Sequence, residues 1–69
     1  MTKTEKVRLH LIEKGSITSW EAIQLYGATR LSAIIYILRN QDMNIINERI
    51  KFTDRFGSKS SYVKYILED

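Results

Sequence analysis

The sequence predicts an α+β fold in which three short helices precede a C-terminal β-hairpin. Apolar residues recur at every third or fourth position as far as Leu38, which is the spacing of one helix face. Beyond Asn44 they alternate with polar residues, which is the pattern of a half-buried strand. A chain of 69 residues has room for one small core. We therefore expect a single domain over residues 1–69.

The first helix is expected over about residues 4–14. Thr2 or Thr4 can accept a hydrogen bond from a free backbone N–H of the first turn. Gly15 can end the helix in the left-handed conformation. The side chains on its apolar stripe are Val7, His10 and Leu11. A very short extended piece, residues 16–17, is expected next.

The second helix is expected over about residues 19–26. Thr18 and Glu21 have the spacing of a capping box, in which each side chain accepts from the other residue's backbone N–H. Gly27 is suited to end this helix. Trp20 lies one turn into it, where we expect the indole to anchor the core.

The third helix is expected over about residues 30–40, with Thr29 as its cap. Its apolar stripe is complete at i, i+3, i+4 and i+7 and consists of Leu31, Ile34, Ile35 and Leu38. Gly27 and Ala28 form a plausible turn between the second and third helices. Two short helices joined in this way are typical of a helix-turn-helix, whose second helix enters the DNA major groove.

The hairpin is expected to use strands at about residues 44–53 and 61–67, joined by the polar connection 54–60. The apolar side of its first strand carries Ile46, Ile50 and Phe52. One face of its second strand carries Val63, Tyr65 and Leu67. The connection lacks a tight Asn-Gly turn, which predicts a mobile tip.

This order of elements resembles the winged helix-turn-helix domains, in which a β-hairpin wing follows the second helix of the pair. The segments 18–22 (Thr-Ser-Trp-Glu-Ala), 26–32 (Tyr-Gly-Ala-Thr-Arg-Leu-Ser) and 37–39 (Ile-Leu-Arg) are similar to a family of small helix-turn-helix domains common in bacteriophage and prophage proteins. The resemblance covers about residues 5–67. Where such domains usually have a glycine before the wing, this chain has Asp42, a residue that tolerates the left-handed conformation.

The resemblance implies a DNA-binding surface on the second helix of the pair and on the wing. The implied contact residues are Thr29, Arg30, Ser32, Ala33, Tyr36, Arg39, Asn40, Arg55 and Lys59. Arg30 can reach a phosphate or the O6/N7 edge of guanine, and the hydroxyls of Thr29 and Ser32 suit phosphate oxygens. Ala33 allows close approach and contact with a thymine methyl group. Tyr36, Arg39 and Asn40 can reach the DNA backbone, and the two wing residues can reach phosphates or the minor groove.

Structural roles for the same residues stay open. Arg30 can be solvated or paired with Glu21, and Tyr36 can pack under the wing. Arg55 and Lys59 can serve only as solubilising charges of an exposed turn.

The charge balance is consistent with a polyanion as the partner. Eleven Lys and Arg residues against eight Asp and Glu residues give a net charge of +3 and a pI near 9.4. The basic residues cluster between positions 49 and 64, where five of them accompany one acidic residue, Asp54. The five are Arg49, Lys51, Arg55, Lys59 and Lys64. We expect phosphate contacts in this segment.

Composition also restricts the other functions. The chain has no cysteine and one histidine, His10, which excludes a disulfide and a thiolate metal site and leaves that histidine a structural or solvent-facing role. No apolar run approaches the roughly 18 residues of a membrane span, so we expect a soluble, intracellular protein. The resemblance implies that its location is the cytoplasm of a bacterial host. No nucleophile–base pair, paired carboxylates or phosphate-cradling loop is present, so no enzyme activity, cofactor or metal is expected.

The sequence therefore predicts double-stranded DNA binding by a phage or prophage transcriptional regulator or an excisionase-like architectural factor. A protein-binding use of the fold stays open, such as a phage-encoded inhibitor of a host protein. Its apolar anchors would be Tyr36, Ile37, Phe56 and Tyr62. A homodimer is compatible with both functions.

Overall fold

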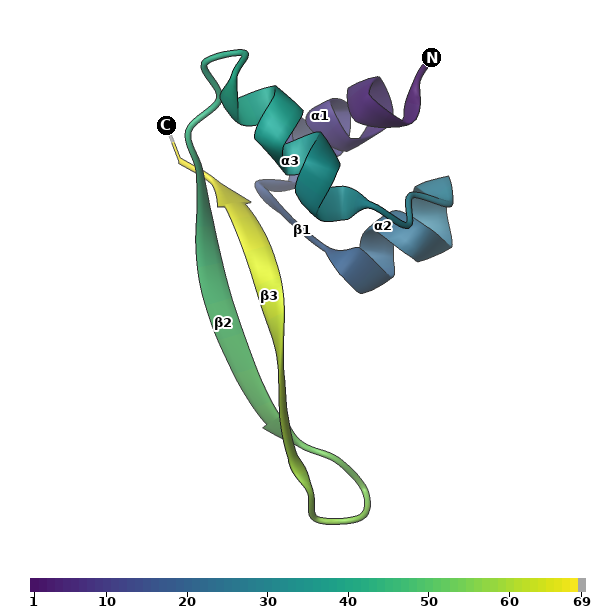
Figure 1. Cartoon of the computed structure of the whole chain (residues 1–69), viewed down its shortest axis with the longest axis vertical. Helices are drawn as coiled ribbons and strands as arrows, with labels where there is room; N and C mark the ends of the chain where they lie inside the picture. Colours follow the sequence, from purple (N-terminus) through teal and green to yellow (C-terminus); the bar gives the residue numbers. More distant parts are fainter. Residues whose placement is uncertain (69) are drawn as a thin grey trace.

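The computed structural model describes residues 1–68, which form three helices and three strands (Figure 1). The helices are α1 (Lys3–Lys14), α2 (Ser19–Tyr26) and α3 (Leu31–Arg39), and the strands are β1 (Ser16–Thr18), β2 (Ile45–Thr53) and β3 (Lys59–Leu67). The helices gather around one end of the β2–β3 hairpin, whose other end projects away from them (Figure 1). The predicted α+β class is confirmed, with three helices before a C-terminal hairpin.

The ends of α1 and α2 are fixed by the residues that the sequence indicated. The Thr2 hydroxyl accepts from the Glu5 N–H at 3.1 Å, and Gly15 ends α1 at φ 84°. At α2, the Thr18 hydroxyl accepts from the Glu21 N–H at 3.2 Å, and the Glu21 carboxylate accepts from the Thr18 N–H at 3.0 Å. The predicted capping box is therefore confirmed.

The start of α3 differs from the sequence-based expectation. Arg30, not Thr29, occupies the N-cap, and its side chain makes no capping hydrogen bond. The Arg30 carbonyl accepts from the N–H groups of Ala33 and Ile34 at 3.2 and 3.3 Å, so the helical ladder begins there. Thr29 consequently lies one residue outside the cap. The N–H groups of the first turn are left without a side-chain acceptor from the cap.

The chain turns from α3 into the hairpin through a left-handed residue. Asp42 has φ 66° and is the one non-glycine residue with positive φ in the described chain. The N–H groups of Gln41 and Met43 both donate to the Leu38 carbonyl, at 3.0 and 3.3 Å. The predicted retention of this turn with aspartate in place of glycine is confirmed.

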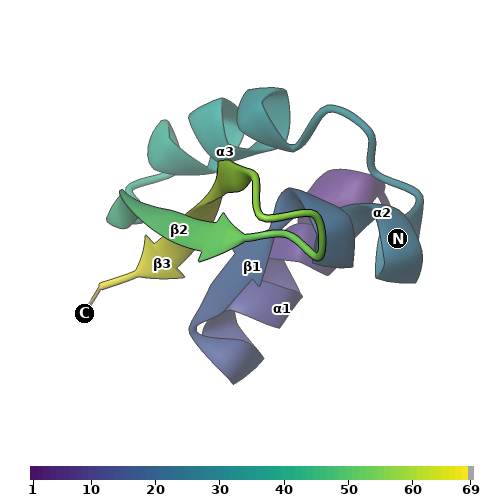
Figure 2. The ribbon, with the colours of Figure 1, turned by 90° about the horizontal axis from the view of Figure 1, so that it is seen from below.

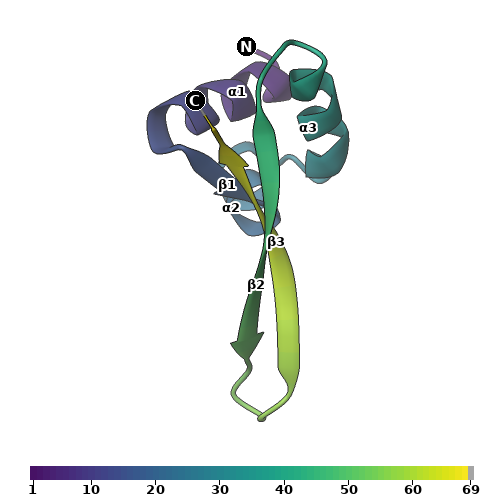
Figure 3. The ribbon, with the colours of Figure 1, turned by 90° about the vertical axis from the view of Figure 1, so that its left-hand side faces the viewer.

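The three strands form an antiparallel sheet in the order β1–β3–β2. β1 pairs with β3 only from Ser16↔Ile66 to Thr18↔Lys64, whereas β2 pairs with β3 over its full length, from Ile45↔Leu67 to Thr53↔Lys59. β3 therefore begins ahead of the expected position 61. The outer part of the hairpin is a two-stranded ribbon that twists strongly along its length (Figure 3).

The core lies between the helices and the inner end of the sheet. Figure 2, which looks along the hairpin, shows α3 above the strands, with α1 and α2 to the right. The buried apolar residues come from every helix and from β1 and β2, and they include the whole predicted stripe of α3. They are Val7, Leu11, Ile17, Ala22, Ala28, Leu31, Ile34, Ile35, Leu38 and Ile45. Tyr26, Met43, Tyr65 and Leu67 pack against this cluster.

Ile45 is the β2 residue that joins the core, and its pairing with β3 shows which face of the hairpin packs against the helices. Ile45 lies opposite Leu67, and alternation puts Tyr65 on the same face. The expected apolar side of β2, with Ile46 and Phe52, therefore lies on the reverse of the sheet, where both side chains are exposed.

The prediction that Trp20 anchors the core is wrong. The indole is 69% exposed. Ala22 points into the core, and Trp20 lies two residues earlier, about 200° around the helix at ~100° per residue. In so short a helix the periodicity could not show which face is buried.

His10 has a structural role. Its ring is buried, its Nδ1 lies 2.8 Å from the Tyr26 hydroxyl, and its Nε2 lies 3.9 Å from Oε2 of Glu21. Both partners belong to α2, one near each end of that helix. The imidazole thus connects the middle of α1 to the C-terminal end of α2 through Tyr26, while its Nε2 faces Glu21 without a hydrogen bond.

We expect Thr18→Ala to lower the free energy of unfolding by about 1 kcal/mol, because it removes the hydroxyl that caps α2. Thr18→Ser keeps the hydroxyl and is the matched control. Urea denaturation followed by circular dichroism measures both. Equal stability of Thr18→Ala and the wild type would contradict a stabilising capping box.

We expect Trp20→Ala to change the free energy of unfolding by less than about 0.5 kcal/mol, because the indole is exposed. Leu11→Ala, at a fully buried position, should cost about 2–5 kcal/mol. Unfolding should be followed by circular dichroism, because Trp20 is the single tryptophan and its replacement removes the tryptophan fluorescence signal. A large loss for Trp20→Ala would show that the indole packs in the core after all.

Candidate nucleic-acid interface

The outer face of α3 is the first component of the candidate site. Burial of the apolar stripe turns the opposite side of the helix to solvent, and all seven residues predicted from this region are exposed. They are Thr29, Arg30, Ser32, Ala33, Tyr36, Arg39 and Asn40. Tyr36 is 60% exposed, so it does not pack under the wing.

Arg30 stands at the start of this face. Within residues 1–68 no salt bridge joins it to Glu21, whose carboxylate instead accepts from the N–H and the hydroxyl of Thr18, at 3.0 and 3.2 Å. Beside Arg30 are the first-turn N–H groups of α3, which carry the positive end of the helix dipole. The arrangement favours an anion at this end of the helix.

Arg39 lies at the other end of α3 and makes a contact that the sequence did not indicate. Its Nε and Nη2 donate to the Ile45 carbonyl at 3.0 and 2.8 Å, and Nη2 also donates to Oδ1 of Asn47 at 2.6 Å. These bonds join the C-terminal end of α3 to the start of β2. Arg39 therefore fixes the helix relative to the hairpin, and its contact with the DNA backbone stays a prediction.

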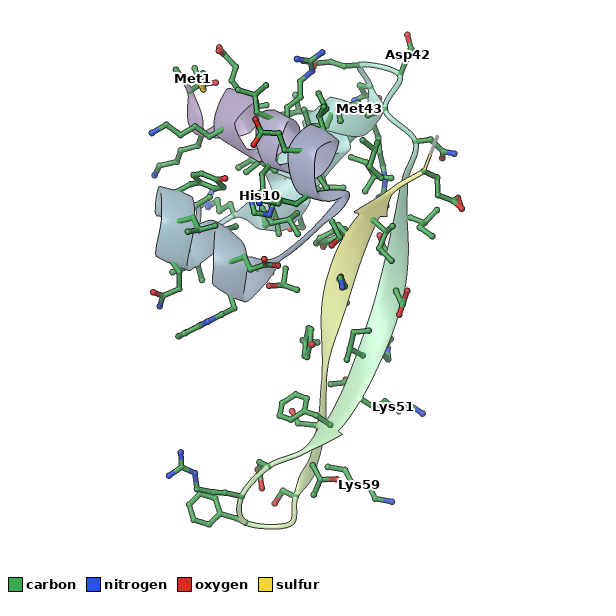
Figure 4. The ribbon with its side chains drawn as sticks, turned by 180° about the vertical axis from the view of Figure 1, so that it is seen from behind. Met1, His10, Asp42, Met43, Lys51 and Lys59 are labelled. Carbon is green, nitrogen blue, oxygen red and sulfur yellow. The ribbon has the colours of Figure 1, made fainter. Side chains whose placement is uncertain are left out.

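The hairpin β2–β3, which we call the wing, is the second component. Its register puts Arg49, Lys51 and Lys59 on one side, and we call these three residues the basic face of the wing. Together with neighbouring side chains they line a shallow concave surface that also includes Thr53 and Ser61. Lys51 and Lys59 extend to the same side of the ribbon (Figure 4). Arg49 reaches across the strands, with Nη1 3.5 Å from the Ser61 hydroxyl.

Two of these residues, Arg49 and Lys51, were not among the contact residues implied by the resemblance. The signal was present in the sequence as basic residues at alternating positions of one strand. Only the register shows that this alternation brings them to the side that carries Lys59. Arg55 does not belong to this face, because it lies in the loop at the tip.

The tip is the third component, and its loop is closed by hydrogen bonds that the sequence analysis did not predict. Oδ1 of Asp54 accepts from the N–H groups of Phe56 and Ser58, at 2.8 and 3.0 Å. The Asp54 N–H donates to the Ser58 carbonyl at 2.9 Å, and Gly57, at φ 81°, donates to the Asp54 carbonyl at 3.0 Å. This hydrogen bonding closes the loop through the Asp54 side chain and backbone, and the mobility of the tip stays a prediction.

The reverse side of the wing carries aromatic and aliphatic side chains together with the Glu48–Lys64 strand pair. Phe52 and Tyr62 contact each other there, with ring centroids 5.8 Å apart. Near the inner end of the ribbon, a second concave surface lies between α2 and β3 and is lined in part by Trp20, Tyr62 and Lys64. The four apolar anchors considered for a protein partner are all exposed, namely Tyr36, Ile37, Phe56 and Tyr62.

No group of three or more His, Cys, Asp or Glu side chains in residues 1–68 is placed to hold a metal ion. No helix in the same range has the length and apolar character needed to cross a bilayer.

Comparison with known proteins agrees with this architecture. The family model described as "Winged helix-turn-helix domain" matches residues 2–69. Neither the curated proteins nor the solved structures gave a match. A domain of this kind suggests DNA as the partner. Because the match spans nearly the whole chain and the structure has three helices with an antiparallel sheet, the chain belongs to the winged helix-turn-helix domain family.

Proposed function

We propose that the protein binds double-stranded DNA, with the outer face of α3 in the major groove and the wing on the DNA backbone. We further propose that it acts in the cytoplasm of a bacterial host as a phage or prophage transcriptional regulator or excisionase-like factor. The single observation that carries DNA binding is that the outer face of α3 and the basic face of the wing are both exposed on a winged helix-turn-helix fold. The phage association rests on the motif at residues 26–32.

On α3 the residues divide by position. Arg30 and the hydroxyls of Thr29 and Ser32 lie at the N-terminal end, where the helix dipole adds to the attraction for phosphate. One turn further, Ala33 is small enough to let the helix axis approach the bases, and Tyr36 is long enough to reach the backbone. Asn40, the C-cap residue of α3, lies beyond Tyr36 at the end of the exposed face.

On the wing, Arg49, Lys51 and Lys59 supply the positive charge for phosphate contacts. Phosphate contacts orient a protein on the duplex and supply salt-dependent affinity, whereas contacts with base edges supply sequence preference. We therefore assign salt-dependent affinity to the wing together with the N-terminal end of α3, and sequence preference to the residues of α3 that approach the base edges.

The second candidate function, protein binding, is favoured by one observation. Tyr36 and Ile37 are exposed side by side on α3, and such apolar anchors are typical of protein interfaces. Binding of this kind would depend weakly on salt, and apolar substitutions would then weaken it more than arginine substitutions. A homodimer can accompany either function and would place two half-sites about 34–36 Å apart on DNA.

The leading proposal predicts that binding to duplex DNA weakens steeply with salt. Arg30→Ala and Lys51→Ala should each flatten the log–log slope by about 0.9, because each removes one phosphate contact. Fluorescence anisotropy titrations of a mixed-sequence duplex at several salt concentrations measure the slope. The matched control is Arg8→Ala, an exposed arginine on α1 outside the candidate interface, whose slope should equal that of the wild type. Absence of salt-dependent binding by the wild type at low ionic strength would refute DNA binding.

A second prediction separates the two roles of Arg39. Arg39→Lys keeps the charge but loses the forked contact with the Ile45 carbonyl and Asn47, so we expect weaker DNA binding with an unchanged salt slope. The free energy of unfolding should fall by about 1 kcal/mol. Asn47→Ala removes one acceptor without touching the charge and should reproduce part of both effects. If Arg39→Lys instead keeps full affinity and stability, Arg39 does not position the helix.

A further inference from the structure

Phe56 is the most exposed large apolar side chain of the described residues, at 85%. It lies in the loop at the far end of the wing, beside Arg55. The other phenylalanine, Phe52, packs on Tyr62, whereas no aromatic partner is found for Phe56 in residues 1–68. The ring therefore adds nothing visible to the fold, although its exposure to water is unfavourable.

The loop is hydrogen-bonded through the backbone of Phe56. Its own N–H donates to Oδ1 of Asp54, and the same oxygen accepts from Ser58. The one acidic side chain between positions 49 and 64 is thus turned into the loop. What the tip presents outward is an arginine and an aromatic ring on a backbone that is already ordered, which lowers the entropy cost of binding through it.

Charge identifies the class of partner that this tip fits. The ribbon carries three basic residues on one face next to the tip, namely Arg49, Lys51 and Lys59. A fourth, Arg55, lies in the tip loop itself. An exposed aromatic ring next to an arginine, at the end of a ribbon with three further basic residues on one face, is suited to a polyanion that has an apolar interior. Stacked base pairs between two phosphate backbones have this chemistry. An apolar protein pocket would not account for the four basic residues.

The length of the wing agrees with this partner. Beyond the last pair with β1, Thr18↔Lys64, β3 continues as a ribbon from Lys59 to Val63, which spans about 17 Å at ~3.3 Å per residue. Half a turn of B-DNA, the spacing between a major groove and the adjacent minor groove, is also about 17 Å. With α3 in a major groove, the tip would reach the minor groove.

We propose that the wing tip enters the minor groove of duplex DNA, where Phe56 inserts between two adjacent base pairs and Arg55 lies along the groove, so that the protein bends the DNA it binds. This proposal rests on the DNA binding proposed above and adds a deformation of the duplex. The energy of unstacking is offset by the contacts that the bent DNA makes with the basic face of the wing. Flexible TA steps should be the preferred sites of insertion, because they unstack at the lowest cost.

The test uses a short A·T-rich duplex with 2-aminopurine at TA steps and a fluorescent donor and acceptor at its two ends. At saturating wild-type protein, 2-aminopurine fluorescence should rise as bases unstack, and energy transfer should increase as the ends approach. Phe56→Ala should bind within about tenfold of the wild type and lose both signals. Phe56→Leu, which keeps an apolar side chain, should retain most of both.

The alternative outcomes are distinguishable. If the Phe56→Ala complex unstacks and bends DNA as the wild type does, the insertion proposal is overturned while DNA binding stands. If the wild type does not bind the duplex at low salt, both proposals fail. If Phe56→Ala leaves the DNA signals intact but converts a dimer to a monomer in sedimentation equilibrium, Phe56 contacts a second copy of the chain and the proposal is likewise overturned. Since Phe56 is remote from the core, circular dichroism should show that the variant folds.

Discussion

Burial of the apolar stripe of α3 is the constraint on which the rest of the structure depends. Leu31, Ile34, Ile35 and Leu38 use one side of a helix of nine residues to join the core. The opposite side must then face solvent, whatever residues it carries. The same packing sets the direction in which the chain leaves α3, and therefore where the wing begins.

Arg39 and the turn after it fix the orientation of the wing relative to α3. The turn at Asp42 is held to α3 through the Leu38 carbonyl, and the Arg39 guanidinium spans from the helix to the backbone of Ile45. Ile45 is itself buried in the core. The two candidate DNA-contacting elements, α3 and the wing, are thus joined where Ile45 is buried in the core. A binding surface formed by two elements requires such rigid support.

Local features of the fold could be predicted from the sequence because their causes are local. The Thr18–Glu21 capping box, the left-handed Gly15 and Gly27, and the positive φ at Asp42 depend on residues within one or two turns. The stripe of α3 was also predictable, since four apolar residues at one spacing leave little choice of face.

The parts that sequence reasoning missed depend on contacts between distant segments. Trp20 and Ala22 are both apolar, and the packing of α2 against α1 and β1 decides which of them is buried. Arg39 resembled a DNA-contacting residue because nothing in the sequence shows that the Ile45 carbonyl lies within its reach. The hydrogen-bonded loop at the tip was also missed, although its cause is local. An aspartate followed three residues later by glycine is a sequence signal for a turn in which the carboxylate accepts from backbone N–H groups.

The distribution of charge is more informative than its total. A net charge of +3 is weak for a polyanion binder, and α1 mixes both signs, with Lys3, Glu5, Lys6, Arg8, Glu13 and Lys14 along its length. In the wing, by contrast, the register puts Arg49, Lys51 and Lys59 on one side, and the loop turns the carboxylate of Asp54 inward. Over a screening length of about 8 Å at physiological ionic strength, such a local group acts on a nearby phosphate almost independently of the distant α1. The strand register therefore determines where the positive potential lies, and it lies on the element that projects farthest from the core.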